Sequence, residues 1–235
     1  MFRTLLLSST LLLGLASAAT AADMAKRVVP AVPVPAGFSW AGSYVGAELG
    51  MGWTNTDLTG WRNGAFYGQA DISGRGALGG IFAGHNWQTG NVVYGLEADI
   101  EWSGVKGDYV AAPNVTYSYA LPVQGSARVR LGWAFDRALV YGTGGVAVAS
   151  LATNYAGNDY SHVRAGWTVG AGLDYAFTDN LFARLEYRYV DFAGFTDVLT
   201  SGRTTMAFSN NPTEHLVHVG LAYKFGGPSA VVAKY

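Results

Sequence analysis

The feature that most constrains this chain is an alternation of apolar and polar residues that recurs along its length. In residues 93–102 the bulky apolar side chains fall on even positions, and Glu97, Asp99 and Glu101 fall on odd positions. The same alternation occupies residues 44–53, 126–133, 163–175, 181–189 and 217–225, and less regular versions occupy residues 77–87 and 139–149. Successive side chains of a β-strand point to opposite faces, so each segment predicts a strand with one apolar and one polar face. The sequence therefore predicts an all-β fold of about eight strands.

Residues 138–158 carry no charge and are long enough to be read as a spanning helix. They contain Gly142, Gly144, Gly145 and Gly157, however. Each glycine inside a helix costs about 1 kcal/mol relative to alanine. A strand accounts better for this segment.

Composition helps to separate a membrane barrel from a water-soluble β-sandwich, whose strands also alternate. Charged residues make up 13% of the chain, against about 25% in a typical soluble domain, which favours an outer surface that faces lipid. A formal net charge of −1 gives no reason to expect nucleic acid as a partner. The chain has no cysteine, which excludes disulfides, thiol catalysis and a lipoprotein anchor.

The predicted strands and their connections fit the outer membrane. Strands of about ten residues match a tilted crossing of the hydrocarbon layer. Short turns are predicted at residues 88–91, 135–137 and 178–180, and long polar loops at residues 54–74, 104–120, 151–162 and 193–213. Short periplasmic turns and long external loops are the outer-membrane pattern, and an even strand number places both termini in the periplasm. Closure into a barrel leaves no strand edge unpaired in lipid.

Aromatic residues at the ends of the apolar faces support the same interpretation. The predicted girdle at the two lipid interfaces consists of Trp53, Trp87, Trp102, Trp133, Tyr187, Tyr189, Tyr223 and Phe225. The fold expected is a closed, antiparallel, up-and-down transmembrane β-barrel.

The first residues predict export. One positive charge at Arg3 precedes an apolar stretch over residues 5–19 and small residues that suit cleavage after Ala21 or Ala22. We therefore expect a cleaved signal peptide at residues 1–22. A Pro/Ala-rich periplasmic segment at 23–38, the barrel at 39–225 and a C-terminal tail at 226–235 are expected to follow.

Several short motifs in order resemble a known family. They are residues 39–44 (SWAGSY), 94–99 (YGLEAD), 128–132 (RVRLG), 166–172 (GWTVGAG), 185–189 (LEYRY) and 219–225 (VGLAYKF). Over about residues 38–225 the chain is similar to the small outer-membrane β-barrel proteins of alphaproteobacteria, the outer-membrane immunogenic or opacity-type porin family. Such barrels usually stop at the aromatic residue that closes the last strand, here Phe225. Either Phe225 or the terminal Tyr235 is then the insertion signal for the barrel-assembly machinery.

The polar faces of the strands predict what fills the barrel. Charged residues expected to point into the lumen are Glu48, Glu97, Asp99, Glu101, Arg128, Arg130, Arg164, Asp174, Arg184, Glu186, Arg188, His218 and Lys224. An eight-stranded barrel is just wide enough for side chains to fill it, and opposite charges on adjacent strands stabilise each other. We predict a structural ion-pair network; the functional alternative is a narrow charged pore.

No motif predicts a catalytic, cofactor or metal site. His215 and His218 lie three apart on a strand, so their side chains face opposite sides. Residues 142–147 resemble a glycine-rich dinucleotide fingerprint, but they lie inside a predicted strand rather than between a strand and a helix. The sequence contains no nucleophile elbow, P-loop or zinc-protease motif. We do not expect an enzyme.

The expected function is that of an integral outer-membrane protein with a structural or surface-interaction role. Its expected partners are membrane lipid and lipopolysaccharide, the assembly machinery, and a host or surface ligand bound by the loops. The predicted loops hold Trp61, Phe66, Tyr67, Tyr109, Tyr117, Tyr155, Tyr160 and His162. The alternatives are a small-solute porin and, from the family resemblance, a haem-binding surface receptor.

Overall fold

The structure is a computed structural model that describes residues 37–112, 115–155, 158–201 and 204–226. The predicted signal peptide, residues 23–36 of the predicted periplasmic segment and residues 227–235 of the tail lie outside the described residues.

Ten β-strands make up almost all of the described chain. They are β1 (Gly42–Arg62), β2 (Ala65–Thr89), β3 (Val92–Ser103), β4 (Lys106–Ala112), β5 (Val115–Phe135), β6 (Ala138–Tyr155), β7 (Asn158–Ala176), β8 (Leu181–Phe192), β9 (Phe195–Ser201) and β10 (Thr204–Lys224). Among the described residues no helix is long and apolar enough to cross a membrane.

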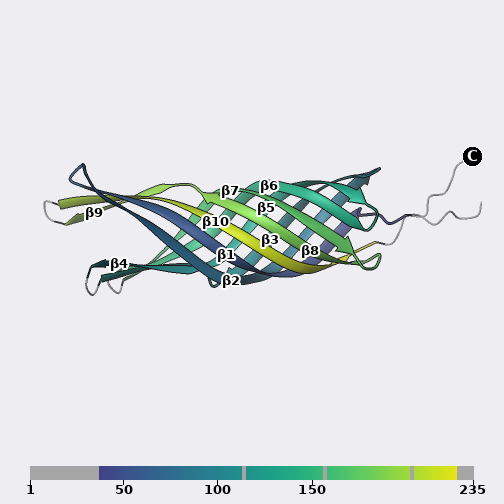
Figure 1. Ribbon diagram of the computed structural model, residues 1–235, viewed down its shortest axis with the longest axis horizontal. Helices are drawn as coiled ribbons and strands as arrows, with labels where there is room; N and C mark the ends of the chain where they lie inside the picture. The colour runs from purple at the N-terminus through teal and green to yellow at the C-terminus, as the bar shows by residue number, and fades with distance from the viewer. Residues whose placement is uncertain (1–36, 113–114, 156–157, 202–203, 227–235) are drawn as a thin grey trace, which may run out of the picture. The chain divides into compact units, whose positions relative to one another are not determined.

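The strands close into an antiparallel barrel (Figure 1). Consecutive strands pair with each other except β3 with β4 and β8 with β9, and β1 pairs with β10 from Tyr44↔Lys224 to Arg62↔Met206, which closes the sheet. Two of the ten strands continue others. After the break at residues 104–105, β4 follows β3 along β5, and after the break at residues 193–194, β9 follows β8 along β10. Eight strands therefore form the wall of the barrel, as predicted.

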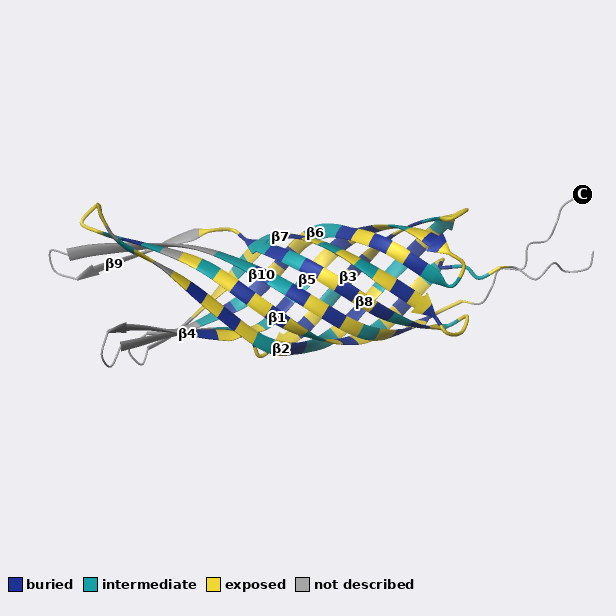
Figure 2. Ribbon diagram, in the orientation of Figure 1, coloured by how far each residue is buried: buried dark blue, intermediate teal, exposed yellow. Residues whose placement is uncertain are grey.

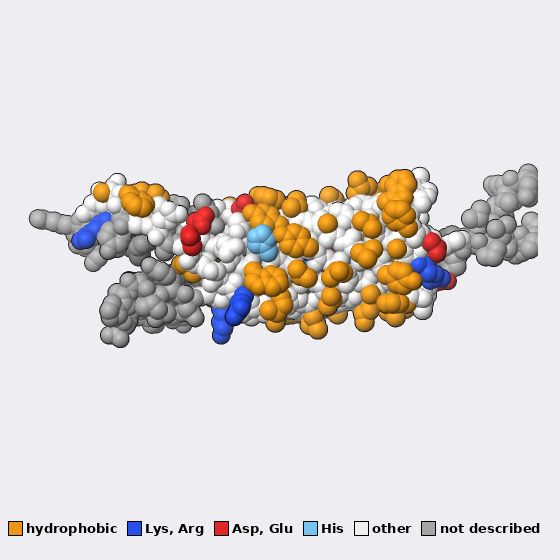
Figure 3. Space-filling view, viewed as in Figure 1, with side chains coloured by type: hydrophobic (Ala, Val, Ile, Leu, Met, Phe, Trp, Pro, Cys, Tyr) orange, Lys and Arg blue, Asp and Glu red, His pale blue; other side chains and the backbone are white. Residues whose placement is uncertain are grey.

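The two faces of the wall follow the predicted alternation (Figure 2). Apolar side chains such as Leu49 and Val163 are 69% and 77% exposed on the outside, where a bilayer surrounds the barrel. Figure 3 shows these side chains as a band around the middle of the molecule. The predicted girdle residues lie on this outer face, and all of them except the half-buried Tyr189 are exposed.

The prediction of four long loops at the outer end is wrong. The strands continue instead, and β1 and β2 are joined by a turn at Asn63 and Gly64, both with positive φ. The extensions pair as hairpins beyond the barrel (Figure 1). The apolar alternation ends there because outward residues of the extensions, such as Asn55, Asp57 and Asp71, are polar and exposed, but the backbone ladder needs no such pattern. The three short turns lie where they were predicted.

Two apolar clusters occupy the lumen, one towards each end of the strands. One lies near the short turns and consists of Trp40, Tyr44, Phe82, Val93, Ala134, Leu139, Tyr141, Ala176, Phe182 and Ala222, with Phe38 against it. The other lies near the hairpin extensions and consists of Ile72, Leu78, Val105, Leu121, Ala147, Ala149, Leu151, Val190, Phe192 and Leu216. The charged residues of the lumen lie between them along the strands.

Candidate functional site

The charged layer of the lumen is the candidate site. Charged side chains that are at most 2% exposed belong to Glu48, Glu97, Asp99, Glu101, Arg128, Arg130, Asp174, Arg184, Glu186, Arg188, Glu214 and His218. Burial is possible at this density because most of these charges meet opposite charges and hydrogen-bonding groups.

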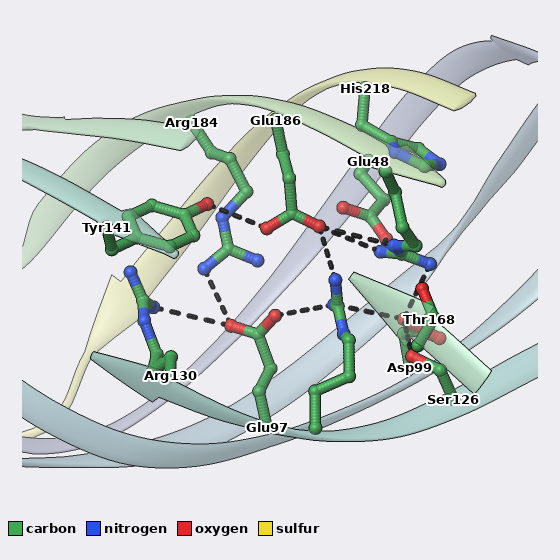
Figure 4. Close-up of polar contacts among 12 residues, drawn as sticks. Glu48, Glu97, Asp99, Ser126, Arg130, Tyr141, Thr168, Arg184, Glu186 and His218 are labelled. Carbon is green, nitrogen blue, oxygen red and sulfur yellow. Dashed lines mark hydrogen bonds and ion pairs between the residues drawn. The ribbon is translucent and has the colours of Figure 1, made fainter. Parts of the chain in front are cut away.

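Arg128 on β5 lies at the centre of this layer. Figure 4 shows the three acids that it contacts, Glu97, Asp99 and Glu186. Its Nη2 donates to Glu97 Oε1 at 2.7 Å and to Asp99 Oδ1 at 3.1 Å, both on β3. Its Nη1 donates across the lumen to Glu186 on β8. One guanidinium thereby connects neighbouring strands and opposite walls of the barrel.

A second group of ion pairs lies on the side of the short turns. Arg184 on β8 bridges Glu97 at 2.7 Å and Asp174 at 3.2 Å. Arg130 on β5 bridges the same two acids, at 2.7 Å to Asp174 and 3.4 Å to Glu97. The phenol of Tyr44 donates to Glu97 Oε2 at 2.6 Å. Two acids and two arginines thus form a closed cycle of alternating charge.

Arg188 on β8 contacts the acids on the other side of the charged layer. Its Nη1 lies 2.9 Å from Asp99 Oδ1, and its Nη2 lies 3.1 Å from Glu186 Oε1. It approaches Glu101 and Glu48 only at 3.6 and 3.8 Å. Neither of these two longer approaches is a hydrogen bond, so this side of the layer is less well paired than the other.

Two predicted lumen residues lie apart from these ion pairs. Lys224 is buried at the end of β10, where its Nζ donates to the carbonyl of Ser39. Arg164 on β7 is half-buried and has a contact of its own, but it is not among the residues that these ion pairs join.

Sequence reasoning missed several polar residues of the lumen, among them Tyr44, Tyr141 and Glu214. Tyr44 and Tyr141 donate to Glu97 and Glu186, Tyr141 at 2.8 Å, and Glu214 on β10 is fully buried. Their positions along the strands could have revealed them, because residues an even number of positions apart on a strand face the same side. Tyr44 lies four residues before Glu48, and Glu214 lies four residues before His218. Aromatic residues were expected on the outer face, and Glu214 falls just beyond a segment predicted to be a loop.

The aromatic residues considered for haem do not form one group among the described side chains. Trp61 and Phe66 face each other on β1 and β2, whereas His162 lies exposed on β7. The side chains of Tyr67, Tyr109, Tyr117, Tyr155 and Tyr160 lie outside the described residues.

Comparison with known proteins agrees with this architecture. Residues 8–225 match the family described as outer membrane protein β-barrel domain. The chain is 37% identical over 193 residues to the 22 kDa outer membrane protein of Rhizobium leguminosarum bv. viciae, covering 82% of each. It is 34% identical over 227 residues to the 25 kDa outer-membrane immunogenic protein of Brucella abortus, covering 95% of this chain and 98% of the relative.

The barrel is also similar to a solved structure, the crystal structure of Neisserial surface protein A. The match has a TM-score of 0.45 and 17% identity, and it covers 79% of this chain and 98% of the other. A similarity of this size says nothing about function.

Proposed function

The chain belongs to the outer membrane protein β-barrel family, and we propose that it is a closed, non-catalytic barrel that serves the membrane as structure and as a surface for contacts. The observation that carries the proposal is the filling of the lumen. A charged layer of fully buried side chains lies between two apolar clusters. An eight-stranded barrel leaves just enough room for such a filling.

The absence of catalysis belongs to the same proposal. The acids at the centre of the layer bond to guanidinium groups and tyrosine hydroxyls. Such pairing is an ordinary structural use of buried charge, whereas acid–base catalysis needs a group within reach of a substrate. Both apolar clusters separate these acids from the ends of the barrel.

Conductance tests the closed barrel against the porin alternative. We expect the protein, extracted from the outer membrane in detergent and added to a planar bilayer, to give no steady current steps. The reason is that a pore requires a continuous water path, which the two apolar clusters interrupt. A general-diffusion porin prepared in the same way is the control. Reproducible steps of constant size, absent from a mock extract, would contradict the proposal.

We further propose lipopolysaccharide as a lipid partner, because a row of outward residues suits its phosphate groups. Across neighbouring strands Tyr189 pairs with His215, His215 with Trp53, Trp53 with Arg75, and Arg75 with Lys106. Arg75 and Lys106 are exposed, and Figure 3 shows basic side chains at the edge of the apolar band nearest the hairpins. Like charges directly opposite each other destabilise a sheet, and an anion between them removes that cost. A guanidinium fork matches a phosphate group well.

We expect lipopolysaccharide to raise the melting temperature of the detergent-extracted protein and Arg75→Gln/Lys106→Gln to lose most of that increase. The loss follows because the variant removes both cations that would meet the phosphates. The matched control is Arg62→Gln, which changes an exposed arginine near the tip of the β1–β2 hairpin. An equal increase in the wild type, the double variant and the control would exclude this row as the binding surface.

A further inference from the structure

Three buried side chains with metal-binding atoms converge in the lumen beside the seam where the barrel closes. Glu48 lies on β1, Glu101 on β3 and His218 on β10, and they are 2%, 0% and 0% exposed. One ligand atom of each lies within 4.8 Å of the other two. Figure 4 shows Glu48 and His218 next to each other at one end of the charged layer.

Glycines on the neighbouring strands let these side chains meet. In the ladder Gly80 lies directly between Glu48 and Glu101, and Gly50 lies opposite His218. A Cβ atom at Gly80 would lie 2.9 Å from Glu101 Cγ, and one at Gly50 would lie 2.9 Å from His218 Cδ2. The missing side chains therefore leave the space into which Glu101 and His218 extend.

Most polar atoms of this group have no hydrogen-bond partner among the described residues; the exception is Glu101 Oε2, which accepts a hydrogen bond from Gln124 Nε2 at 3.0 Å. Neither carboxylate oxygen of Glu48 has a hydrogen-bond partner, and neither ring nitrogen of His218 has one. The Nε2 atom of His218 lies 2.7 Å from Glu101 Oε1 but without hydrogen-bond geometry. Burying a carboxylate away from water costs far more free energy when it has no partner than when it is paired. These atoms therefore indicate that a cation binds beside them.

The buried charges of the layer also indicate a bound cation, because carboxylates outnumber guanidinium groups. The fully buried carboxylates are Glu48, Glu97, Asp99, Glu101, Asp174, Glu186 and Glu214, and the fully buried guanidinium groups are Arg128, Arg130, Arg184 and Arg188. The unbalanced carboxylates lie on this side, where Glu214 also has two oxygens without a hydrogen-bond partner. Among the described residues, the cationic side chains with a nitrogen within 4.0 Å of Glu48 or Glu101 are Arg188 and His218, and the neutral amide of Gln124 donates to Glu101 Oε2 at 3.0 Å.

We propose that Glu48, Glu101 and His218 bind a divalent transition-metal cation, with Zn²⁺ as the best-suited ion. An imidazole together with carboxylates favours Zn²⁺ over Mg²⁺ and Ca²⁺, which prefer oxygen ligands alone. Bonds of about 2.0–2.2 Å require ligand atoms roughly 3.4 Å apart, so small side-chain rotations complete the site. The cation joins β1, β3 and β10 and stabilises the closure of the barrel at the β1–β10 seam.

The test measures metal bound to the protein extracted in detergent from cells grown with added ZnCl₂. After gel filtration in metal-free buffer, elemental analysis should find about one zinc per chain in the wild type. Glu48→Gln and His218→Gln should each retain at least about fivefold less, since each removes one of three ligands. The shift between boiled and unboiled samples on a gel verifies that each variant is folded.

Two controls separate this site from other metal binding. Asp174→Asn makes the same kind of change at a fully buried carboxylate of the other group of ion pairs, and His215→Gln removes a histidine of the outer face. Both should keep the wild-type zinc content. Equal zinc in the wild type and Glu48→Gln, or loss of zinc in His215→Gln alone, would overturn the proposal.

A second measurement needs no variant. A strong chelator should lower the unfolding temperature of the wild type, and ZnCl₂ should restore it. The proposal is overturned if the wild type contains no zinc and the chelator does not change its unfolding temperature. If Glu48→Gln is then more stable than the wild type, the unsatisfied Glu48 is held as a neutral acid instead.

Discussion

Arg128→Ala is expected to lower the free energy of unfolding by about 3–5 kcal/mol, which is typical when one partner of a buried ion pair is removed. Arg128 contacts Glu97 at 2.7 Å, Asp99 at 3.1 Å and Glu186, all with fully buried side chains. Alanine leaves these carboxylates without their shared cation and also leaves a cavity. Urea unfolding in lipid vesicles, followed by tryptophan fluorescence and by the gel shift, measures the change.

Arg137→Ala is the matched control. Arg137 pairs with Asp179 at 2.9 Å, but the two side chains are 38% and 48% exposed, and pairs of this kind contribute about 0–1 kcal/mol. If Arg128→Ala and Arg137→Ala shift the urea midpoint by similarly small amounts, the lumen network does not stabilise the barrel. A large loss for Arg128→Ala alone supports its structural role.

The part of this network that sequence could predict is the part set by neighbouring strands. Alternation assigned Glu97 and Arg128 to the inner face, and adjacent acidic and basic strands predicted their pairing; the structure places them directly opposite in the β3–β5 ladder. The contacts across the lumen follow a different rule. The bond from Arg128 to Glu186 depends on the diameter of the closed barrel and on strand stagger, which no local pattern encodes.

Two further features gave no signal in the alternation. The outward residues of the hairpin extensions include polar, exposed side chains such as Asn55, Asp57 and Asp71, so these strands lack the continuous apolar face on which the prediction relied. The second feature is the group of tyrosines that point into the lumen, although the prediction expected aromatic residues on the outer face. Tyr141 is 3% exposed, its hydroxyl bonds to Glu186, and its ring lies 3.9 Å from the Arg130 guanidinium carbon. An aromatic ring therefore serves the polar layer here, although composition alone favours the lipid face for such a residue.

Trp40 lies at the end of the barrel that carries the short turns, and the sequence analysis placed it within the barrel but assigned it no role, because it precedes the first alternating segment. It is fully buried, although it lies before the start of β1. Its backbone N–H donates to Gln88 Oε1 at 2.7 Å, and its indole Nε1 donates to the carbonyl of Asp136 at 3.1 Å. Its ring packs edge-on against Phe182 with 5.5 Å between the centroids. Trp40 thus connects the segment before β1 to the end of β2 and to the β5–β6 turn, and it helps to close this end of the lumen.

We expect Trp40→Ala to cost about 3–5 kcal/mol of unfolding free energy, as removal of a buried tryptophan usually does. Trp40→Phe separates the causes, since it keeps most of the apolar packing and loses one hydrogen bond, which contributes about 0.5–1.5 kcal/mol. Urea unfolding in vesicles measures both variants. Equal midpoints for the wild type and Trp40→Ala would mean that the folded barrel begins with β1 at Gly42. A large loss extends the folded unit to Trp40 and makes the residues just before the first strand part of the closed end of the barrel at the short turns.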